Sequence, residues 1–90
     1  MKFEWDPSKS ESNRRKHGID FQTAKELWHD QLRIEIYAPD PVEDRSIIIG
    51  KFQGKLWTCV YTMRGDTARI ISVRRSRSKE VKLYEKENAG

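Results

Sequence analysis

The stretch RSIIIGKFQGKLWTCVYTMRGDTARIISVRR, residues 45–75, decides the fold. It contains three runs rich in β-branched and aromatic residues, at 45–52, 55–63 and 68–75, and such runs are typical of strands. The turn signals QG and RGD separate the runs, and connections this short join neighbouring strands in antiparallel hairpins. The stretch therefore predicts three consecutive strands of one antiparallel sheet.

The residues before residue 31 predict a short strand and two helices. FEW, at residues 3–5, is typical of a strand. Asp6 can cap a first helix with Pro7 in its first turn, and Gly18 supplies the left-handed residue that ends it. Asp20 can cap a second helix whose apolar residues fall on one face.

The remaining segments complete the expected architecture. QLRIEIYA, residues 31–38, alternates apolar and polar residues as a half-exposed strand does. Residues 78–88 predict a C-terminal helix with Val81 and Tyr84 facing inward. Helices segregated from a small antiparallel sheet make an α+β fold, and a length of 90 residues predicts a single domain over residues 1–90.

Composition excludes several classes of protein. No apolar run exceeds three residues, so no segment can span a bilayer, and the start MKFEWDP has charges where a signal peptide needs an apolar core. One cysteine cannot form an internal disulfide, and with two distant histidines it cannot form a zinc site. These features predict a soluble cytoplasmic protein with no metal, no cofactor and no membrane association.

The net charge of +4 is unevenly distributed along the chain. Residues 1–44 hold seven Lys and Arg against ten Asp and Glu, whereas residues 45–82 hold ten Lys and Arg against only Asp66 and Glu80. A basic half on a small domain is expected for a protein that binds nucleic acid or an acidic protein partner. Composition alone does not choose between these two.

The basic residues at the end of the last predicted strand have two interpretations. Side-chain alternation in a regular strand places Arg69 and Arg75 on one face and Arg74 on the other. Guanidinium groups stay protonated and offer a planar fork that suits phosphate oxygens. Charges at a sheet margin also discourage aggregation through strand pairing. Spacing alone supports both interpretations equally.

Two further positions have both a structural and a functional interpretation. Lys16 and His17 lie in the last turn of the first predicted helix, where they can complement the helix dipole or face a substrate, with His17 better suited as a proton donor than as a base. Glu80 lies in the first turn of the last helix. It can stabilise the helix start or orient an arginine through a bidentate pair.

These residues resemble a known family. FEWDPSKSESNRRKHGIDF, residues 3–21, resembles the opening pattern of the BrnT family of bacterial ribonuclease toxins, which is F-x-W-D, then Lys and Asn, then K-H-G-I before an aromatic residue. Later positions of the pattern are matched by Glu43, Arg45, Gly50, RIISVR at residues 69–74, Glu80 and Tyr84. The resemblance covers nearly the whole chain.

The resemblance implies a RelE-like fold, with helices on one face of a twisted antiparallel sheet and an open basic groove for RNA on the other. It implies an endoribonuclease toxin that inhibits translation and growth by cleaving RNA. It also implies a ribbon-helix-helix antitoxin that neutralises the toxin, with promoter DNA bound only by the toxin–antitoxin complex.

Cleavage through the 2′-hydroxyl of RNA needs no metal ion, but it requires proton transfer and stabilisation of a phosphorane. The residues expected to take part in catalysis are His17 as the acid, Arg45 and Arg74 on the phosphorane, and Glu80, which either orients an arginine or accepts the 2′-hydroxyl proton. Those expected to bind substrate are Lys16, Arg69, Arg75, Arg77 and Tyr84.

Two other interpretations remain open. The first is a non-catalytic module whose basic face binds nucleic acid or an acidic partner. The second is a degenerate toxin that serves only as a repressor subunit.

Overall fold

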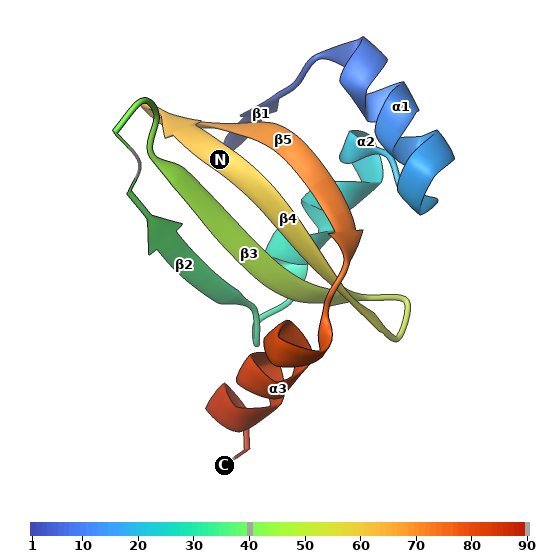
Figure 1. Ribbon diagram of the computed structural model, residues 1–90, viewed down its shortest axis with the longest axis vertical. Coiled ribbons are helices and arrows are strands. Elements are labelled where there is room, and N and C mark those ends of the chain that lie inside the picture. Colours follow the sequence, from blue (N-terminus) through green and yellow to red (C-terminus); the bar gives the residue numbers. More distant parts are fainter. Residues whose placement is uncertain (40, 90) are drawn as a thin grey trace.

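The five strands of the sheet have the spatial order β1-β5-β4-β3-β2 in the computed structural model, which describes residues 1–39 and 41–89 (Figure 1). The strands are β1 (Lys2–Glu4), β2 (Ile34–Ala38), β3 (Arg45–Phe52), β4 (Lys55–Arg64) and β5 (Thr67–Arg75). The three strands predicted within residues 45–75 are confirmed, and they pair antiparallel in sequence order.

The expectation of an antiparallel sheet is wrong for β1. This strand pairs parallel to β5, so the α+β fold contains a mixed sheet. Strands joined by a short hairpin must run antiparallel, but no such turn links β1 to β5. The long connection through the two N-terminal helices and three strands lets β1 enter in the other direction.

The predicted first helix is confirmed as α1 (Pro7–His17). Its N-terminus is capped by Asp6, which accepts a hydrogen bond from the Ser8 backbone N–H at 2.9 Å, and Gly18 ends it with a φ of 79°. The C-terminal helix is α3 (Ser78–Glu87). Among the residues that the structure describes, no helix has the length and apolar character needed to cross a membrane.

The predicted second helix is only partly α-helical. After α2 (Phe21–Ala24) the chain tightens into a 3₁₀ helix, η1 (Lys25–His29). The close packing of η1 on β3 requires a glycine, because a Cβ atom at Gly50 would lie 3.0 Å from the carbonyl oxygen of Leu27. A regular helical pattern in the sequence does not reveal this change of winding.

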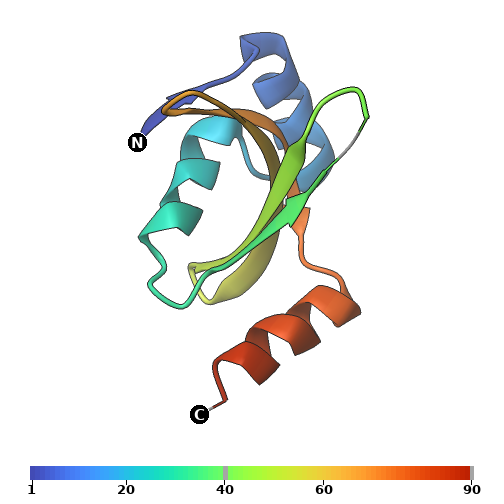
Figure 2. The same cartoon turned by 90° about the vertical axis from the view of Figure 1, so that its left-hand side faces the viewer.

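The hydrophobic core lies between the sheet and α2 with η1. We call this side of the sheet the helix-covered face. Figure 2 shows α2 and η1 packed along it. The buried residues here are Ile19, Phe21, Ala24, Leu27, Ile48, Cys59, Tyr61, Ala68, Ile70 and Val73. The Trp28 ring extends the core by meeting Phe3 and Tyr61 edge-on, at centroid distances of 4.9 and 5.0 Å.

The opposite side, which we call the open face, carries Ile36, Ile47, Val60 and Ser72, all half-buried. Figure 1 looks onto this face, with α2 and η1 behind the sheet and α3 at one end. This face is therefore only partly covered, with α3 packed at one end of it.

A β-bulge in β5 changes which arginines share a face. Val60 pairs with Ser72 but Tyr61 pairs with Ile70, so Ile71 has no partner in the register. The extra residue reverses the alternation beyond it. Arg69 therefore faces the same side as Arg74, and the prediction that Arg69 shares a face with Arg75 is wrong.

Helix α1 lies along β5 where β1 no longer covers it, since β1 pairs only with residues 67–69. The side chain of Asn13, 8% exposed, takes the place of a strand partner for Val73. Its amide donates to the carbonyl oxygens of Val73 and Ile19, both at 2.8 Å, and its oxygen accepts from the Val73 N–H at 3.2 Å. One side chain thus fixes α1, the α1–α2 connection and β5 together.

Asp30 connects η1, β3 and α3. Its carboxylate accepts hydrogen bonds from the Tyr84 hydroxyl at 2.7 Å and from the backbone N–H groups of Lys51 and Leu32 at 2.8 and 2.9 Å. The bond to Leu32 belongs to a turn, and the Leu32 side chain is 54% exposed. Strand β2 therefore begins at Ile34, three residues after the predicted start at Gln31.

Replacing Asn13 with alanine is expected to lower the free energy of unfolding by about 2–4 kcal/mol, because it leaves buried backbone groups of β5 and of Ile19 without partners. Urea denaturation at neutral pH measures the loss. The control is Ser12→Ala, an exposed neighbour on the same helix, which should change stability by less than about 0.5 kcal/mol. Equal stability of the two variants would contradict the role given to Asn13.

Candidate active site

A partly buried charged pair lies at the end of β5. The Arg74 guanidinium donates from Nη1 to Glu80 Oε1 at 2.7 Å and from Nη2 to Oε2 at 2.8 Å. Only 25% of the Arg74 side chain and 20% of the Glu80 side chain are exposed. This is a bidentate pair, the arrangement in which a carboxylate fixes both the position and the plane of an arginine. It also joins α3 to the sheet.

Further donors occupy the Glu80 carboxylate. Its Oε1 atom accepts from the Arg77 backbone N–H at 2.7 Å and from the hydroxyl of Thr58 at 3.0 Å. Thr58 lies opposite Arg74 in the ladder, is fully buried, and has its hydroxyl 2.8 Å from that of Ser76. Thr58 was not predicted as a site residue, because threonine is common in strands. Only the pairing of β4 with β5 shows that it lies beside Arg74 and bonds to Glu80.

The electrostatics of Glu80 follow from this geometry. The hydrogen bonds from Arg74, then those from the Arg77 N–H and the Thr58 hydroxyl, outweigh burial and lower the pKa of Glu80 to about 2. The same pair raises the pKa of Arg74. Glu80 is therefore a fixed anion at neutral pH with its oxygens already engaged, which suits it to orient Arg74 and not to accept a proton.

Arg74 keeps donors for a second partner. An arginine has five N–H donors. Nη1 uses its two on Glu80 and on the Arg75 carbonyl oxygen at 3.3 Å, and Nη2 uses one on Glu80. Within residues 1–39 and 41–89, the Nε–H and one Nη2–H of Arg74 make no hydrogen bond. These two donors project from the same edge of the guanidinium. Two parallel donors on one edge match two oxygens of a phosphate.

Lys16 and His17 end α1 beside the edge of β5. Together with Ile71 and Ser72 they line a small cleft of about 230 Å³. His17 is half-buried and also lines a second, larger cleft on the other side of the α1 terminus. Asn13, one turn before His17, bonds to Val73, the residue before Arg74, and His17 lines the larger cleft together with Arg75. The structure thus brings His17 and Arg74 to the same end of β5.

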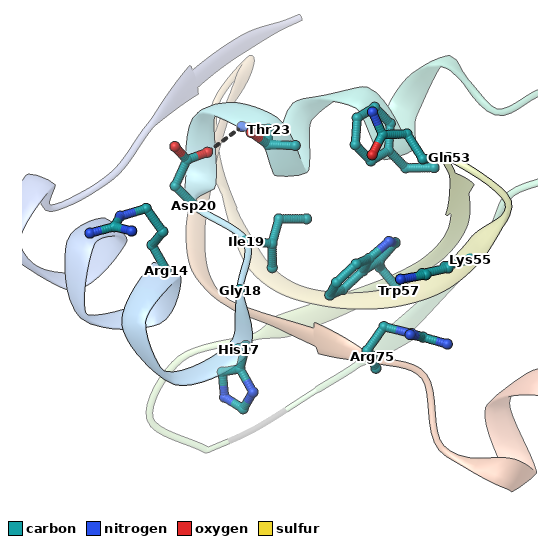
Figure 3. A pocket seen from close by; sticks show the side chains of 11 residues that line it. Arg14, His17, Gly18, Ile19, Asp20, Thr23, Gln53, Lys55, Trp57 and Arg75 are labelled. Atoms are coloured by element: carbon teal, nitrogen blue, oxygen red, sulfur yellow. Dashed lines mark hydrogen bonds between the residues drawn. The ribbon is translucent and has the colours of Figure 1, made fainter.

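The larger cleft, of about 760 Å³, lies between the α1–α2 connection and the β3–β4 hairpin (Figure 3). Trp57, Lys55 and Arg75 form one wall, and Asp20 and His17 lie on the other side. The Arg75 guanidinium lies over the Trp57 ring, 5.4 Å from its centroid. Arg75 was expected to bind substrate, whereas Trp57 was not identified from the sequence because its position resembles that of a core residue.

Arg45 and Arg69 lie toward the other end of the open face. Arg69 is half-buried, pairs with Thr62 in the ladder, and has its Nη1 3.9 Å from a carboxylate oxygen of Glu4. Arg45 begins β3, four residues before Ile49, which lies level with Thr58 and Arg74. At about 3.3 Å per strand residue, Arg45 is about 13 Å along the sheet from that level. The structure brings Arg45 to the level of Arg69 and not to that of Arg74.

The last two expected residues differ in exposure. Arg77 is exposed and precedes the first turn of α3. Tyr84 is 5% exposed inside the contact between α3 and the sheet, and burial together with its bond to Asp30 raises its pKa to about 12. Lys51 lies over its ring, 5.9 Å from the centroid. Tyr84 thus anchors α3, a position that gives it little access to a substrate.

Among the residues described, no group of three or more His, Cys, Asp or Glu side chains is arranged to hold a metal ion.

The lowered pKa of Glu80 predicts a specific loss of stability in acid. Because its folded-state pKa of about 2 lies below the ordinary value of 4.5, the ionised form stabilises the fold above about pH 5, and this contribution is lost as the pH falls toward 2. Glu80→Gln is expected to remove roughly 2–3 kcal/mol at pH 7 and to unfold with a weaker pH dependence than the parent between pH 5 and 2.

Urea denaturation at a series of pH values measures this difference. The control is Glu85→Gln on the exposed side of the same helix, which should leave the stability at pH 7 unchanged. Identical pH dependence in the parent and in Glu80→Gln would rule out the proposed electrostatic role of Glu80.

Comparison with known proteins identifies one family. Residues 5–80 match the family model described as the ribonuclease toxin BrnT of type II toxin–antitoxin systems. No curated protein matches the chain. The matched range includes α1, four of the five strands (β2 to β5) and the Arg74–Glu80 pair, so the resemblance seen in the opening motif extends to the site. The chain belongs to the BrnT family of ribonuclease toxins of type II toxin–antitoxin systems.

Proposed function

We propose that this chain is a cytoplasmic endoribonuclease toxin that cleaves RNA through the substrate's own 2′-hydroxyl, without a metal ion, on a fold of the RelE type. The observation that carries the proposal is the Arg74 fork, fixed by Glu80 with one donor edge left over, at the same end of β5 as His17. Family membership implies an RNA substrate and an antitoxin partner.

In the proposed reaction the 2′-oxygen attacks the adjacent phosphorus while the bond from phosphorus to the 5′-oxygen breaks. The products are a 2′,3′-cyclic phosphate and a free 5′-hydroxyl. The 2′-hydroxyl loses its proton to solvent water, the departing 5′-oxygen gains one from a donor on the protein, and the phosphorane carries extra negative charge between these events. The protein contributes alignment, charge stabilisation and a proton donor.

Arg74 stabilises the phosphorane through its Nε–H and its remaining Nη2–H. Glu80 holds the guanidinium plane in place before the substrate arrives, so little reorganisation is needed during the reaction. His17 gives a proton to the 5′-oxygen, and Lys16 beside it contacts phosphate. Because Arg45 lies at the far end of the open face, we assign it with Arg69 to neighbouring phosphates and not to the phosphorane.

The antitoxin is proposed to be a ribbon-helix-helix protein. Residues 45–82 hold ten Lys and Arg against two acidic residues, and much of this segment forms the open face. An acidic partner segment bound there would exclude RNA by occupying the same cations. Promoter DNA would be bound by the complex, since the DNA-binding fold belongs to the antitoxin.

Arg74→Ala and His17→Ala are expected to lower the rate of RNA cleavage at least about a hundredfold, because one removes charge stabilisation and the other the proton donor. The assay uses purified protein and total RNA in excess chelator. The matched controls are Arg64→Ala, which removes an exposed arginine paired with Glu43, and His29→Ala, which removes an exposed histidine paired with Glu26. Both controls should retain cleavage.

Arg74→Lys separates charge from geometry, since it keeps the positive charge but loses the fork, and its rate should fall between those of the parent and Arg74→Ala. Undiminished cleavage by Arg74→Ala and His17→Ala would overturn the assignment. Absence of cleavage by the parent protein would instead favour a module that only binds RNA or a partner.

The chemical route predicts defined ends. Cleaved RNA should carry a 2′,3′-cyclic phosphate and a 5′-hydroxyl, because the 2′-oxygen is the nucleophile. A substrate with a single 2′-deoxy residue at the cleaved nucleotide should resist cleavage there and still be cut elsewhere. Mass spectrometry of the fragments identifies the ends, and a 5′-phosphate on the downstream fragment would refute this route.

A further inference from the structure

We propose that the larger cleft, defined by Trp57, Lys55, Arg75, Asp20 and His17, binds one nucleotide of the RNA next to the scissile phosphate. The inference rests on the proposed function, because it names a substrate subsite on the other side of β5 from Arg74. It adds a second surface to the site, on the helix-covered face of the sheet.

The volume of the cleft is sufficient for one nucleotide. Its volume of about 760 Å³ falls in the range of pockets that hold small ligands. Figure 3 shows the Ile19 side chain directed between the wall formed by Trp57 and Arg75 and the side that carries Asp20 and His17. A protein helix would instead need a long apolar groove.

The chemistry of the walls favours single-stranded RNA. Trp57 and Arg75 are ladder partners, and the guanidinium lies over the indole ring, so together they place a cation and an aromatic ring on the same wall of the cleft. Unpaired bases stack on such rings and on guanidinium planes. Lys55, exposed at the start of β4, adds a cation for the phosphate of the same nucleotide. Aromatic rings combined with cations characterise sites for single-stranded nucleic acid.

The position of the cleft connects it to the proposed reaction centre. His17 lines both clefts, one on each side of the α1 terminus. Arg74 and Arg75 are consecutive residues of β5 whose side chains point to opposite faces, beside Thr58 and Trp57 respectively. An RNA strand that crosses the end of β5 at His17 therefore meets Arg74 on the open face and Arg75 in the cleft.

The test uses binding alone. The probe is the tightest binder among a set of mixed-sequence 2′-fluoro RNA hexanucleotides, which lack the nucleophile, and dissociation constants come from fluorescence anisotropy. Trp57→Leu is expected to weaken binding about tenfold, and Trp57→Phe less, because the ring is retained. Lys55→Ala should weaken binding severalfold, whereas the matched control Lys86→Ala, an exposed lysine on α3, should not.

An abasic residue placed at successive positions of the probe locates the bound base. At one position the abasic residue should weaken binding to the parent protein about tenfold and should not weaken binding to Trp57→Leu any further. This non-additivity would show that the base at that position contacts the Trp57 ring. Circular dichroism melting confirms that each variant is folded. If Trp57→Leu does not fold, Trp57→Phe and Lys55→Ala still decide the question.

Parent-like RNA binding by the folded Trp57 and Lys55 variants overturns the inference, even if the same variants no longer bind the antitoxin. The ribonuclease proposal is judged separately. If the protein binds the probe in the expected pattern but cleaves no RNA, the nucleotide subsite is supported and the ribonuclease proposal is refuted. If it cleaves RNA but the cleft variants bind the probe as the parent does, the ribonuclease proposal is supported and the subsite is refuted.

Discussion

Beyond Arg69, the described part of the chain gives the β5 backbone a strand neighbour on one side only, and Asn13 bonds to the backbone of Val73 on the other. Buried backbone groups must be paired, so the side chain that pairs them also decides what can lie beside the strand. In this protein the element beside the strand is the last part of α1, which carries His17. The bulge at Ile71 lies in the same uncovered segment and decides that Arg74, not Arg75, faces the open side. The site therefore depends on how one strand edge is completed.

The second requirement of the site is that α3 stays in place. Much of its attachment is polar: Glu80 binds Arg74 and Thr58, Tyr84 binds Asp30, and Asn88 donates to the Leu32 carbonyl oxygen at 3.0 Å. Polar contacts of this kind specify an orientation more strictly than apolar packing does. The same carboxylate that attaches the helix also directs the guanidinium, so the proposed charge-stabilising group and the C-terminal helix form one unit.

Most of the secondary structure was predictable from the sequence because its signals are local. Alternation and turn residues indicated β3, β4 and β5, and the residues Asp6, Pro7 and Gly18 marked both ends of α1. The errors concern relations between distant segments. The parallel direction of β1 depends on a strand more than sixty residues away, and the faces of Arg69 and Arg75 depend on a bulge that no residue type at Ile71 announces. For the same reason His17, Arg74 and Glu80 could be proposed individually, but the network through Thr58 and the wall formed by Trp57 required the ladder.

The contacts of Asn13 also constrain the order in which the protein can acquire its structure during synthesis. Asn13 and Val73 are separated by 60 positions, and β1 pairs with residues 67–69, so these two N-terminal contacts form only after β5 has been synthesised. Helix α1 cannot take its final place, and His17 cannot approach Arg74, until β5 has been made, and Arg74 is oriented only after α3 follows. A nascent chain that has not yet reached β5 therefore lacks both the Asn13 bonds to that strand and the oriented Arg74 guanidinium.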